Sequence, residues 1–299
     1  MDAKLSEIIC CPVCHGKLLP ENQALTCSAC SMKYQVAESG QAILMPEPEK
    51  KVLDHSQNQA ENVSALRAFF TRHQDSFFAK AARGLARALT PPTFVHLKSR
   101  KEILEILFPQ GRETMVIDIG AGPNPISPKA IAIDISLESG APVLALAERL
   151  PFLDSSLDGV CACGVLEHLK KPWIAGQEMM RVVKPGGYVY IEVPLLQGIH
   201  YNPYDEQRFT PDGLETLFSG LNTVRKGLAS GPGSALAHVL PNWLALVFSF
   251  GSSLWFELLY FFFAWMTFPI KYTDAFLLKH PKAFRAPLGS YYLGQKQKT

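Results

Sequence analysis

The sequence predicts an α/β domain built on a doubly wound, mostly parallel sheet, and three observations indicate it. Short apolar runs recur at 116–119, 131–135, 159–165 and 188–193, as is typical of parallel strands buried on both faces. The segment 173–183 has apolar residues at helical spacing. It is followed by Lys-Pro-Gly-Gly, which is a helix stop. Strands that alternate with helices are typical of a doubly wound fold.

The first predicted strand ends in a glycine turn formed by Gly120, Ala121 and Gly122. Glycines directly after a strand let the backbone approach a ligand closely, and ligands of parallel sheets bind beyond the carboxyl ends of the strands. Asp134 stands near the end of the second strand, where an acidic side chain can accept hydrogen bonds from ribose hydroxyls. A tight turn and a solvated aspartate would explain these features equally well if they stood alone.

Three further segments follow in order: Glu-Arg-Leu-Pro-Phe at 148–152, Asp-Gly-Val-Cys-Ala-Cys-Gly-Val-Leu-Glu-His at 158–168, and Lys-Pro-Gly-Gly-Tyr-Val-Tyr-Ile-Glu-Val-Pro at 184–194. Together with the glycine turn and Asp134, they resemble the class I S-adenosylmethionine-dependent methyltransferases of type 11. The resemblance covers roughly residues 98–228 and a last strand near the C-terminus. It implies a Rossmann-like sheet of seven strands, and S-adenosyl-L-methionine as the cofactor.

The family's motif positions imply which residues hold that cofactor. The glycine turn would pass under its methionine part, and Asp118 would hold its amino end. Asp134 would hold the ribose, the segment 147–148 would flank the adenine, and the segment 163–164 would lie near the sulfonium. The full set is Asp118, Gly120, Ala121, Gly122, Asp134, Ala147, Glu148, Cys163 and Gly164.

Two departures from the family pattern concern the rim of this site. Leu146 stands where family members often carry an aspartate that contacts the adenine amino group. Only eleven residues, 120–130, separate the first two strands, which is at the short limit for a parallel crossover of about a dozen. We therefore expect the first crossover helix to be a stub, and the next connection, 136–141, to be shorter still.

Two Cys-x-x-Cys pairs stand near the N-terminus, Cys11 with Cys14 and Cys27 with Cys30. Their spacing is that of a zinc ion held by four thiolates, and a segment of roughly 45 residues needs such a metal because it cannot bury much core. The segment resembles the Trm112-like zinc ribbons, which implies a structural ion. Disulfides are the alternative, but a reducing compartment disfavours them. Cys10 is expected to be a buried thiol outside the site.

The chain is expected to divide into a zinc ribbon at 1–46, a linker with a basic amphipathic helix at 47–95, and a methyltransferase domain at 96–299. The net charge of +2 gives no whole-chain sign of nucleic-acid binding. The basic helix is either a packing helix with a solvated face or a surface helix that meets anionic lipid or RNA.

An aromatic, apolar stretch, Trp243–Ile270, contains a single ionisable residue, Glu257. It is long enough for a membrane span, which needs about 20 apolar residues. However, the expected sixth and seventh strands, 223–230 and 290–295, bracket it, so the chain must leave and return on one side of a membrane. Glu257 would divide the stretch into two halves, each of a length that suits re-entrant or interfacial helices.

Basic residues follow this stretch, as expected beside an anionic membrane surface; they are Lys271, Lys279, Lys282 and Arg285. We therefore expect a hydrophobic helical insert at about 234–286 that dips into a membrane without crossing it. A buried cap over the active site and a homodimer interface are the alternatives.

The methyl acceptor is expected beyond the fourth and fifth strands, on the segment 195–210. His200 is the first candidate for a general base, with Tyr204 or Asp205 as orienting groups. An ion pair between Asp205 and Arg208 that fixes the loop is the alternative role. His168 is expected near the cofactor, where it either makes a structural hydrogen bond or transfers a proton.

Three functions fit the sequence. The leading one is methyl transfer to a lipophilic small molecule or lipid-linked acceptor, such as a quinone or polyprenyl intermediate, by a cytoplasmic protein on the inner face of a membrane. The second is methylation of ribosomal or transfer RNA, which the ribbon and the basic helix favour. The third is a non-catalytic methyltransferase fold that serves as an interaction module, which the missing adenine contact leaves open.

Overall fold

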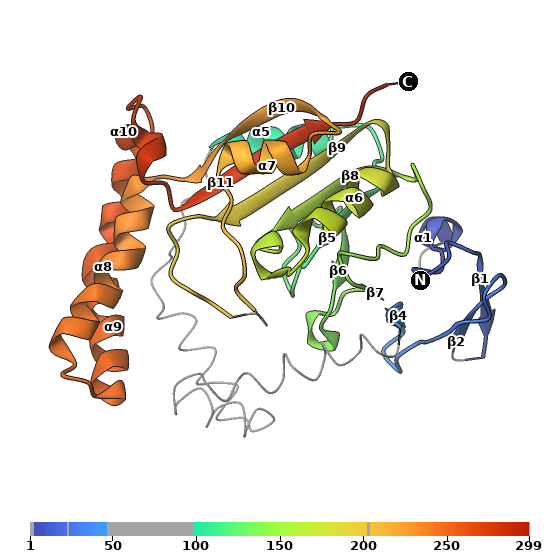
Figure 1. Ribbon diagram of the computed structural model, residues 1–299, viewed down its shortest axis with the longest axis horizontal. Coiled ribbons are helices and arrows are strands. Elements are labelled where there is room, and N and C mark those ends of the chain that lie inside the picture. The colour runs from blue at the N-terminus through green and yellow to red at the C-terminus, as the bar shows by residue number, and fades with distance from the viewer. Residues whose placement is uncertain (1–2, 23, 47–97, 202–203, 299) are drawn as a thin grey trace.

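The computed structural model describes residues 3–22, 24–46, 98–201 and 204–298, and a mixed sheet of eight strands forms its centre (Figure 1). The order of the strands is β10-β11-β9-β8-β5-β6-β7-β4. The predicted linker and basic helix at 47–95 lie outside the described residues. The strands are β4 Ala42–Ile43, β5 Val116–Ile119, β6 Ile131–Asp134, β7 Val143–Leu144, β8 Leu157–Cys163, β9 Val183–Pro194, β10 Asn222–Ser230 and β11 Gly289–Gln295.

The pairing of the strands confirms the predicted Rossmann-like sheet. Strands β5 to β9 pair with one another in parallel, whereas β11 pairs antiparallel with both β9 and β10. Six of these seven strands match the predicted ranges, whereas β7 was implied only by the family's count of seven strands. The eighth strand, β4, comes from the N-terminal segment and pairs in parallel with β7 at the edge of the sheet.

Three helices cover the sheet: α5 (Lys98–Leu107), α6 (Pro172–Val182) and α7 (Pro211–Leu217). Neighbouring residues of one strand face opposite layers, as the two-residue period of a strand requires. Ile117 packs in the cluster that contains α6 and α7, while Val116 packs with α5. The sheet is therefore buried on both faces, which explains the continuous apolar runs of its central strands.

The first crossover, 120–130, corrects one expectation: it contains turns and no helical stub. Pro123, Pro125 and Pro128 remove backbone donors from this short loop. The carboxylate of Asp118 instead accepts a hydrogen bond from the Ile126 amide at 2.6 Å. The next connection is as short as expected and holds one turn of 3-10 helix, η3 (Leu137–Ser139).

The N-terminal segment is a small ribbon that packs directly on the α/β domain. It consists of the helix α1 (Ala3–Ile8) and a three-stranded antiparallel sheet of β1 (Leu18–Glu21), β2 (Ala24–Cys27) and β3 (Lys33–Gln35). Backbone hydrogen bonds of 3.0 Å join it to the domain, from the Cys10 amide to the Pro151 carbonyl and from the Leu153 amide to the Ile8 carbonyl. The ribbon residues Leu5, Ile9, Leu25 and Tyr34 belong to the same hydrophobic core as Phe152 of the domain.

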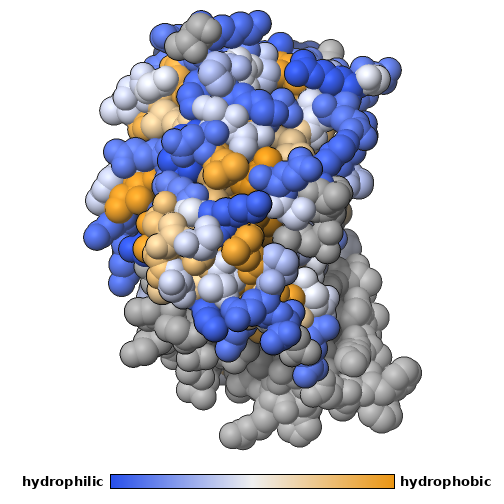
Figure 2. Space-filling model, turned by 90° about the vertical axis from the view of Figure 1, so that its right-hand side faces the viewer, coloured by the Kyte–Doolittle hydropathy of each residue, from blue (hydrophilic) through white to orange (hydrophobic). Residues whose placement is uncertain are grey.

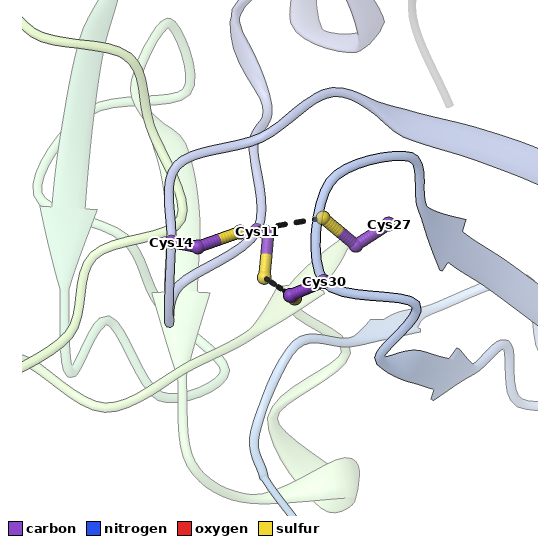
Figure 3. A group of neighbouring side chains, drawn as sticks. All are labelled: Cys11, Cys14, Cys27 and Cys30. Carbon is purple, nitrogen blue, oxygen red and sulfur yellow. Dashed lines mark hydrogen bonds between the residues drawn. The ribbon is translucent and has the colours of Figure 1, made fainter.

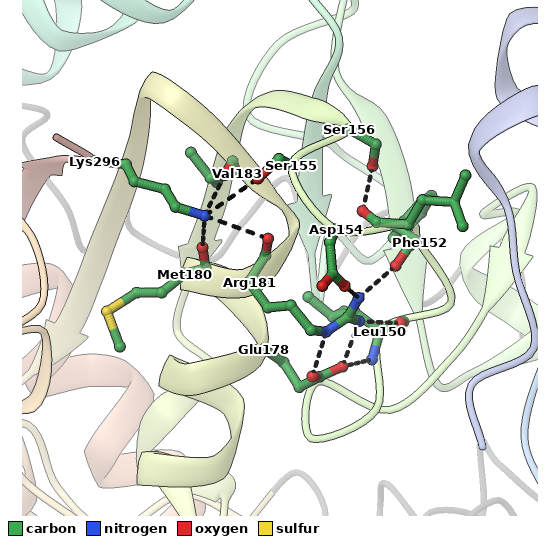
Figure 4. Close-up of polar contacts among 11 residues, drawn as sticks. Leu150, Phe152, Asp154, Ser155, Ser156, Glu178, Met180, Arg181, Val183 and Lys296 are labelled. Carbon is green, nitrogen blue, oxygen red and sulfur yellow. Dashed lines mark hydrogen bonds and ion pairs between the residues drawn. The ribbon is translucent and has the colours of Figure 1, made fainter. Parts of the chain in front are cut away.

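Arg181 of α6 holds the domain segment on which this ribbon docks (Figure 4). Its guanidinium forms ion pairs of 2.7 Å with both Glu178 and Asp154. It also donates hydrogen bonds to the carbonyl oxygens of Leu150 and Phe152, at 2.9 and 2.7 Å. Because these acceptors span the loop between β7 and β8, one side chain fixes the loop beneath the ribbon.

A helical hairpin leaves the sheet between β10 and β11 and forms the left-hand part of Figure 1. Its helices are α8 (Pro232–Phe248) and α9 (Ser253–Thr267), joined by a turn at 249–252. The predicted division at Glu257 is wrong, because Glu257 lies within α9. Gly251 adopts a left-handed conformation in the turn, and the Ser252 side chain caps α9 by accepting from the Trp255 amide.

The base of the hairpin is closed by the segment that follows α9, namely η5 (Phe268–Thr273), α10 (Asp274–Leu277) and η6 (Ala283–Arg285). The buried carboxylate of Asp274 accepts hydrogen bonds from the amides of Gly233 and Ser234, at 2.7 and 3.0 Å, at the start of α8. An anion at a helix N-terminus is favoured by the helix dipole. The hairpin is thus anchored to the sheet at its base.

Candidate active site

The carboxyl ends of β5, β6 and β8 meet at one edge of the sheet and carry the predicted cofactor residues. The turn after β5 requires glycine, since Gly120 has a φ of 66° and a Cβ there would lie 2.5 Å from the Cγ2 of Val165. Gly122 and Gly164 also have positive φ angles. The backbones of the loops after β5 and β8 therefore pass close to each other, as a ligand cradle at the switch point of a doubly wound sheet requires.

The carboxylates of Asp118 and Asp134 hold the loops at this edge of the sheet by accepting hydrogen bonds from backbone amides. Burial raises the pKa of Asp118 to about 6, against the lowering effects of its hydrogen bond from the Ile126 amide and of the nearby Arg100. Arg100 in turn forms an ion pair with Glu192 of β9 at 3.2 Å. The carboxylate of Asp134 accepts hydrogen bonds from the Gly122 and Ser136 amides, at 2.8 and 2.9 Å.

The segment predicted to flank the adenine follows β7 and lies beside the end of β6. The Ala145 amide donates to the carbonyl of Asp134 at 3.0 Å. Ala147 is buried and Glu148 is partly exposed. The roles of these residues and of Cys163 and Gly164 in cofactor binding remain predictions, but the fold brings all of their segments to the same edge of the sheet.

Beyond β8, three titratable side chains converge. Glu167 and His168 lie on the 3-10 helix η4 (Leu166–His168), and His200 lies on the loop after β9. An oxygen of Glu167 is 3.7 Å from the Nε2 atom of His168 and 3.8 Å from the Nε2 atom of His200. A Cβ at Gly164 would lie 3.4 Å from the same Glu167 oxygen, so the three side chains adjoin the predicted cofactor edge.

Sequence reasoning selected His168 and His200 but missed Glu167. The missed signal was its position beside His168 directly after a buried strand. Its side chain is 1% exposed, and burial raises its pKa to about 7. Burial also lowers the pKa of His168. Perturbed titratable groups that meet at the end of a strand are a feature of functional sites.

The loop that carries His200 is held by the predicted ion pair. Asp205 is buried and receives hydrogen bonds from two guanidinium nitrogens of Arg208 and, at 2.8 Å, from the His200 amide. Arg208 lowers the pKa of Asp205 to about 2. The same carboxylate lies 3.6 Å from Nδ1 of His200. Asp205 thus fixes the loop and also stands where it can orient the imidazole.

Tyr204 acts on a different histidine from the one predicted. Its backbone carbonyl contacts the Nδ1 atom of His168, while its ring lies 4.7 Å from the ammonium nitrogen of Lys170. The hairpin also reaches this loop. His238 of α8 is partly buried, and its Nε2 atom would lie 3.7 Å from a Cβ at Gly198.

The four predicted zinc ligands form a second, separate cluster in the ribbon (Figure 3). The sulfurs of Cys11 and Cys30 are 3.7 Å apart and those of Cys14 and Cys27 are 3.4 Å apart, near the roughly 3.8 Å that tetrahedral zinc–thiolate bonds of about 2.3 Å impose. All seven cysteines are free, and Cys10 is buried outside the cluster. The donor set fits a structural zinc ion.

The two halves of the cysteine cluster have the same local geometry. Residues His15 and Ser31, each directly after the second cysteine of its pair, have positive φ angles of 58° and 61°. Their amides donate to the carbonyls of Cys11 and Cys27, at 2.8 and 3.0 Å. Two matching knuckles that each present a pair of thiols are the arrangement of a zinc ribbon.

Comparison with known proteins agrees with both parts of this description. Residues 103–191 match the family of methyltransferase domains, and residues 2–39 match the family of Trm112p-like proteins. Over 80 residues the chain is 38% identical to an "uncharacterized methyltransferase" of Mycobacterium leprae, which covers 27% of this chain and 30% of that protein. A relative of the same description in Mycobacterium tuberculosis is also 38% identical, over 27% of this chain and 32% of that protein.

The chain therefore spans about a third of the length of these curated relatives. Among solved structures, a chain in the complex of the Haloferax volcanii Trm112 methyltransferase activator with a methyltransferase is 18% identical, with a TM-score of 0.45. The match covers 75% of this chain and 97% of that one. The predicted resemblance to type 11 methyltransferases with a Trm112-like ribbon is confirmed by the family matches.

Proposed function

We infer, from the methyltransferase-domain match of residues 103–191, that this chain is an S-adenosylmethionine-dependent methyltransferase. The observation that supports this most is the edge formed by β5, β6 and β8. There a glycine turn without room for a side chain at Gly120 lies between the carboxylates of Asp118 and Asp134. Such a turn suits the close passage of a ligand, and the two carboxylates suit an ammonium group and a ribose.

The residues of the site suit a methyl transfer in which the positioning of the two reactants supplies most of the rate acceleration. Bound S-adenosylmethionine would supply an electrophilic methyl group. The loop after β8 places Gly164 against Glu167, and Glu167 stands within 3.8 Å of both histidines. In this proposal the acceptor approaches Glu167 and the histidines, which can hold it or its proton as the acceptor attacks. Asp205 keeps His200 in this position through the His200 amide.

We propose further that the acceptor is lipophilic and that the hairpin brings the enzyme to a membrane surface. Apolar side chains are exposed along both helices of the hairpin, and Phe250 in its turn is 91% exposed. The stretch Ser253–Leu277, which runs from α9 through η5 and α10 at the base of the hairpin, has the mean hydropathy and length of a membrane helix, and 11% of its most apolar window is buried. In contrast, the face around the ribbon is mostly hydrophilic with scattered apolar residues (Figure 2).

The dimensions of the hairpin favour dipping over crossing. The 17 residues of α8 and the 15 residues of α9 correspond to about 26 and 22 Å, which is less than the roughly 30 Å hydrocarbon core of a bilayer. Both ends of the hairpin join the same sheet through β10 and β11. Lys279, Lys282 and Arg285 are exposed after it, where they suit anionic headgroups. Lys271, predicted to join them, is instead 2% exposed.

Titration of the full chain with S-adenosylmethionine tests the enzyme proposal. We expect binding at pH 8 that weakens as the pH falls through about 6, because protonation of Asp118 removes the charge that would hold the cofactor's ammonium group. Calorimetry at pH 8, 6 and 5 measures this. A chain that stays folded but binds no cofactor at pH 8 would contradict the proposal.

The raised pKa of Asp118 affects the stability of the fold in the opposite direction from its effect on cofactor binding. The pKa of Asp118 is raised on folding, so this group favours the folded state at low pH, and that contribution is lost as the pH rises through about 6. A weaker affinity at pH 5 without loss of the folded state therefore separates cofactor binding from acid unfolding. The nearby Arg100, Asp134 and Glu192 are part of the same electrostatic environment.

Flotation with vesicles of anionic phospholipid tests the membrane proposal. We expect the chain to float with the vesicles, and replacement of Trp255 and Phe262 by serine to abolish flotation, because both side chains are exposed on α9. Trp173→Ser is the matched control, since Trp173 is 52% exposed on α6, away from the hairpin. The proposal would be contradicted if all variants floated equally well, or if the unmodified chain did not float with the vesicles. A dimer that the α9 substitutions dissociate would favour the homodimer alternative.

A further inference from the structure

Glu167, His168 and His200 are arranged as a set of metal ligands. Their ligand atoms all lie within 4.8 Å of one another, and the two Nε2 atoms converge on one Glu167 oxygen at 3.7 and 3.8 Å. Bonds of about 2.0–2.2 Å to a shared ion would bring such atoms to roughly 3–3.5 Å. Small side-chain rotations are therefore enough to close the set around an ion. Two histidines and one carboxylate form a familiar facial set for divalent transition metals.

The far nitrogens of both imidazoles are held in the way that metal ligation requires. The Nδ1 atom of His168 contacts the Tyr204 carbonyl, which can only accept, so this nitrogen carries the proton. The Nδ1 atom of His200 lies 3.3 Å from the Gly198 carbonyl and 3.6 Å from Asp205. Each histidine thus presents the lone pair of its Nε2 atom toward Glu167. Metal-bound histidines almost always donate their other N–H to a carbonyl or a carboxylate in this manner.

Glu167 provides an independent indication of a missing partner. Its side chain is 1% exposed. Oε1 is the oxygen that faces the two imidazoles, while the second oxygen, Oε2, is buried without a hydrogen-bond partner among the described residues. An unpaired buried carboxylate oxygen is costly, and a cation removes that cost. The carbonyl of Glu167 accepts from the Glu206 and Gln207 amides, at 2.7 and 3.0 Å. This ties the helix that carries Glu167 and His168 to the loop that carries His200.

We propose that Glu167, His168 and His200 bind one divalent transition-metal ion, distinct from the structural zinc of the ribbon. Three protein ligands leave coordination positions open, as in catalytic rather than structural sites. The proposal rests on the inferred methyltransferase activity, and it specifies an oxygen acceptor, such as a phenol or an enol, that would occupy an open position. His200 then serves as a ligand instead of a base.

The chemistry of such a transfer balances without a redox step. An ion at this site would stabilise the oxyanion, so the acceptor hydroxyl would lose its proton to solvent. The oxygen lone pair forms a bond to the methyl carbon, and the carbon–sulfur bond breaks with its electron pair going to sulfur. The products are the methyl ether and S-adenosylhomocysteine. Glu167 and the two imidazoles would hold the ion near Gly164, at the end of β8.

Zinc content of the full chain tests the proposal. After saturation with Zn²⁺ and gel filtration, we expect two ions per chain in the unmodified protein and one in Glu167→Gln and in His200→Ala. Calorimetric titration should show that these changes weaken the binding of the second ion by roughly 100-fold or more. His280→Ala is the matched control, because His280 is an exposed histidine outside the cluster, and it should retain two ions.

One ion per chain at saturation, or unchanged affinity for the second ion in both variants, would overturn the proposal. His200→Ala guards against misfolding, since His200 lies on a partly exposed loop, whereas Glu167 is buried. Titration of the same variants with S-adenosylmethionine separates the two inferences. If the variants bind the cofactor but lose the second ion, both the metal site and the methyltransferase proposal are supported. If the unmodified chain binds two ions but no cofactor, the metal site stands and the methyltransferase proposal is contradicted.

Discussion

Replacement of Cys27 by serine should unfold the ribbon and lower the melting temperature of the whole chain by roughly 10 °C or more. Cys27 supplies one of four converging sulfurs, and a Cβ at Gly16 would lie 2.9 Å from its sulfur, so the knuckles are packed around this site. The effect should reach the α/β domain because Leu5 and Ile9 share a core with Phe152. Differential scanning calorimetry measures the change.

Cys10→Ala is the control for this substitution. Cys10 is adjacent in sequence to a ligand and fully buried, but its sulfur lies outside the cluster. Its loss should cost far less, on the order of 1 kcal/mol, as for a small buried side chain. A chelator should reproduce the Cys27→Ser result in the unmodified chain and change little in the variant. An equal melting temperature for Cys27→Ser and the unmodified chain would contradict a zinc site. So would a stabilisation of the unmodified chain that a reductant removes and a chelator does not.

The second large effect is expected from Gly120→Ala, which should weaken S-adenosylmethionine binding by roughly 100-fold or more, equivalent to about 2.7 kcal/mol. An added Cβ would lie 2.5 Å from Val165 Cγ2, and the φ of 66° disfavours any side chain. Relief of this contact must move the turn away from the loop after β8, which changes the shape of the cofactor edge. Calorimetric titration of the purified variant measures the affinity.

Gly111→Ala separates the steric contact with Val165 from backbone strain as the cause of weaker cofactor binding. Gly111 has a φ of 74°, so alanine there introduces similar backbone strain, but a Cβ would have nothing within 4 Å. It should destabilise the chain modestly and leave the affinity for S-adenosylmethionine unchanged. If Gly120→Ala bound the cofactor as tightly as Gly111→Ala does, the glycine turn would not be the passage under the cofactor's methionine part.

The sequence predicted the strands of the sheet well because their apolar runs are long enough to carry a pattern. The runs at 116–119 and 131–135 became β5 and β6. The two Cys-x-x-Cys pairs of the ribbon were equally clear, since this spacing is typical of a metal site, and their four sulfurs converge in the fold. Thr210 also caps α7 as its position before Pro211 suggests, by accepting from the Gly213 amide.

The remaining features depend on contacts between distant parts of the chain. The strand β4 has two residues, too few for any periodicity, and exists because β7 pairs with it. The hairpin turn at 249–252 was obscured by the uniform apolarity around it, so the charge of Glu257 was the wrong marker. Glu167 gained its importance from His200, which lies 33 residues later in the sequence and approaches only in the fold.

The edge strand β4 has a consequence for the order in which this protein folds. Ala42 pairs with Val143, about a hundred residues further along the chain. A ribosome adds roughly 5–20 residues per second, so the N-terminal segment can fold several seconds before the partner strand of β4 is synthesised. During that interval the surface of Leu5 and Ile9 that later meets Phe152 has no native cover. Chaperone demand should therefore peak midway through translation, and fall once β7 and the loop that Arg181 of α6 holds have emerged.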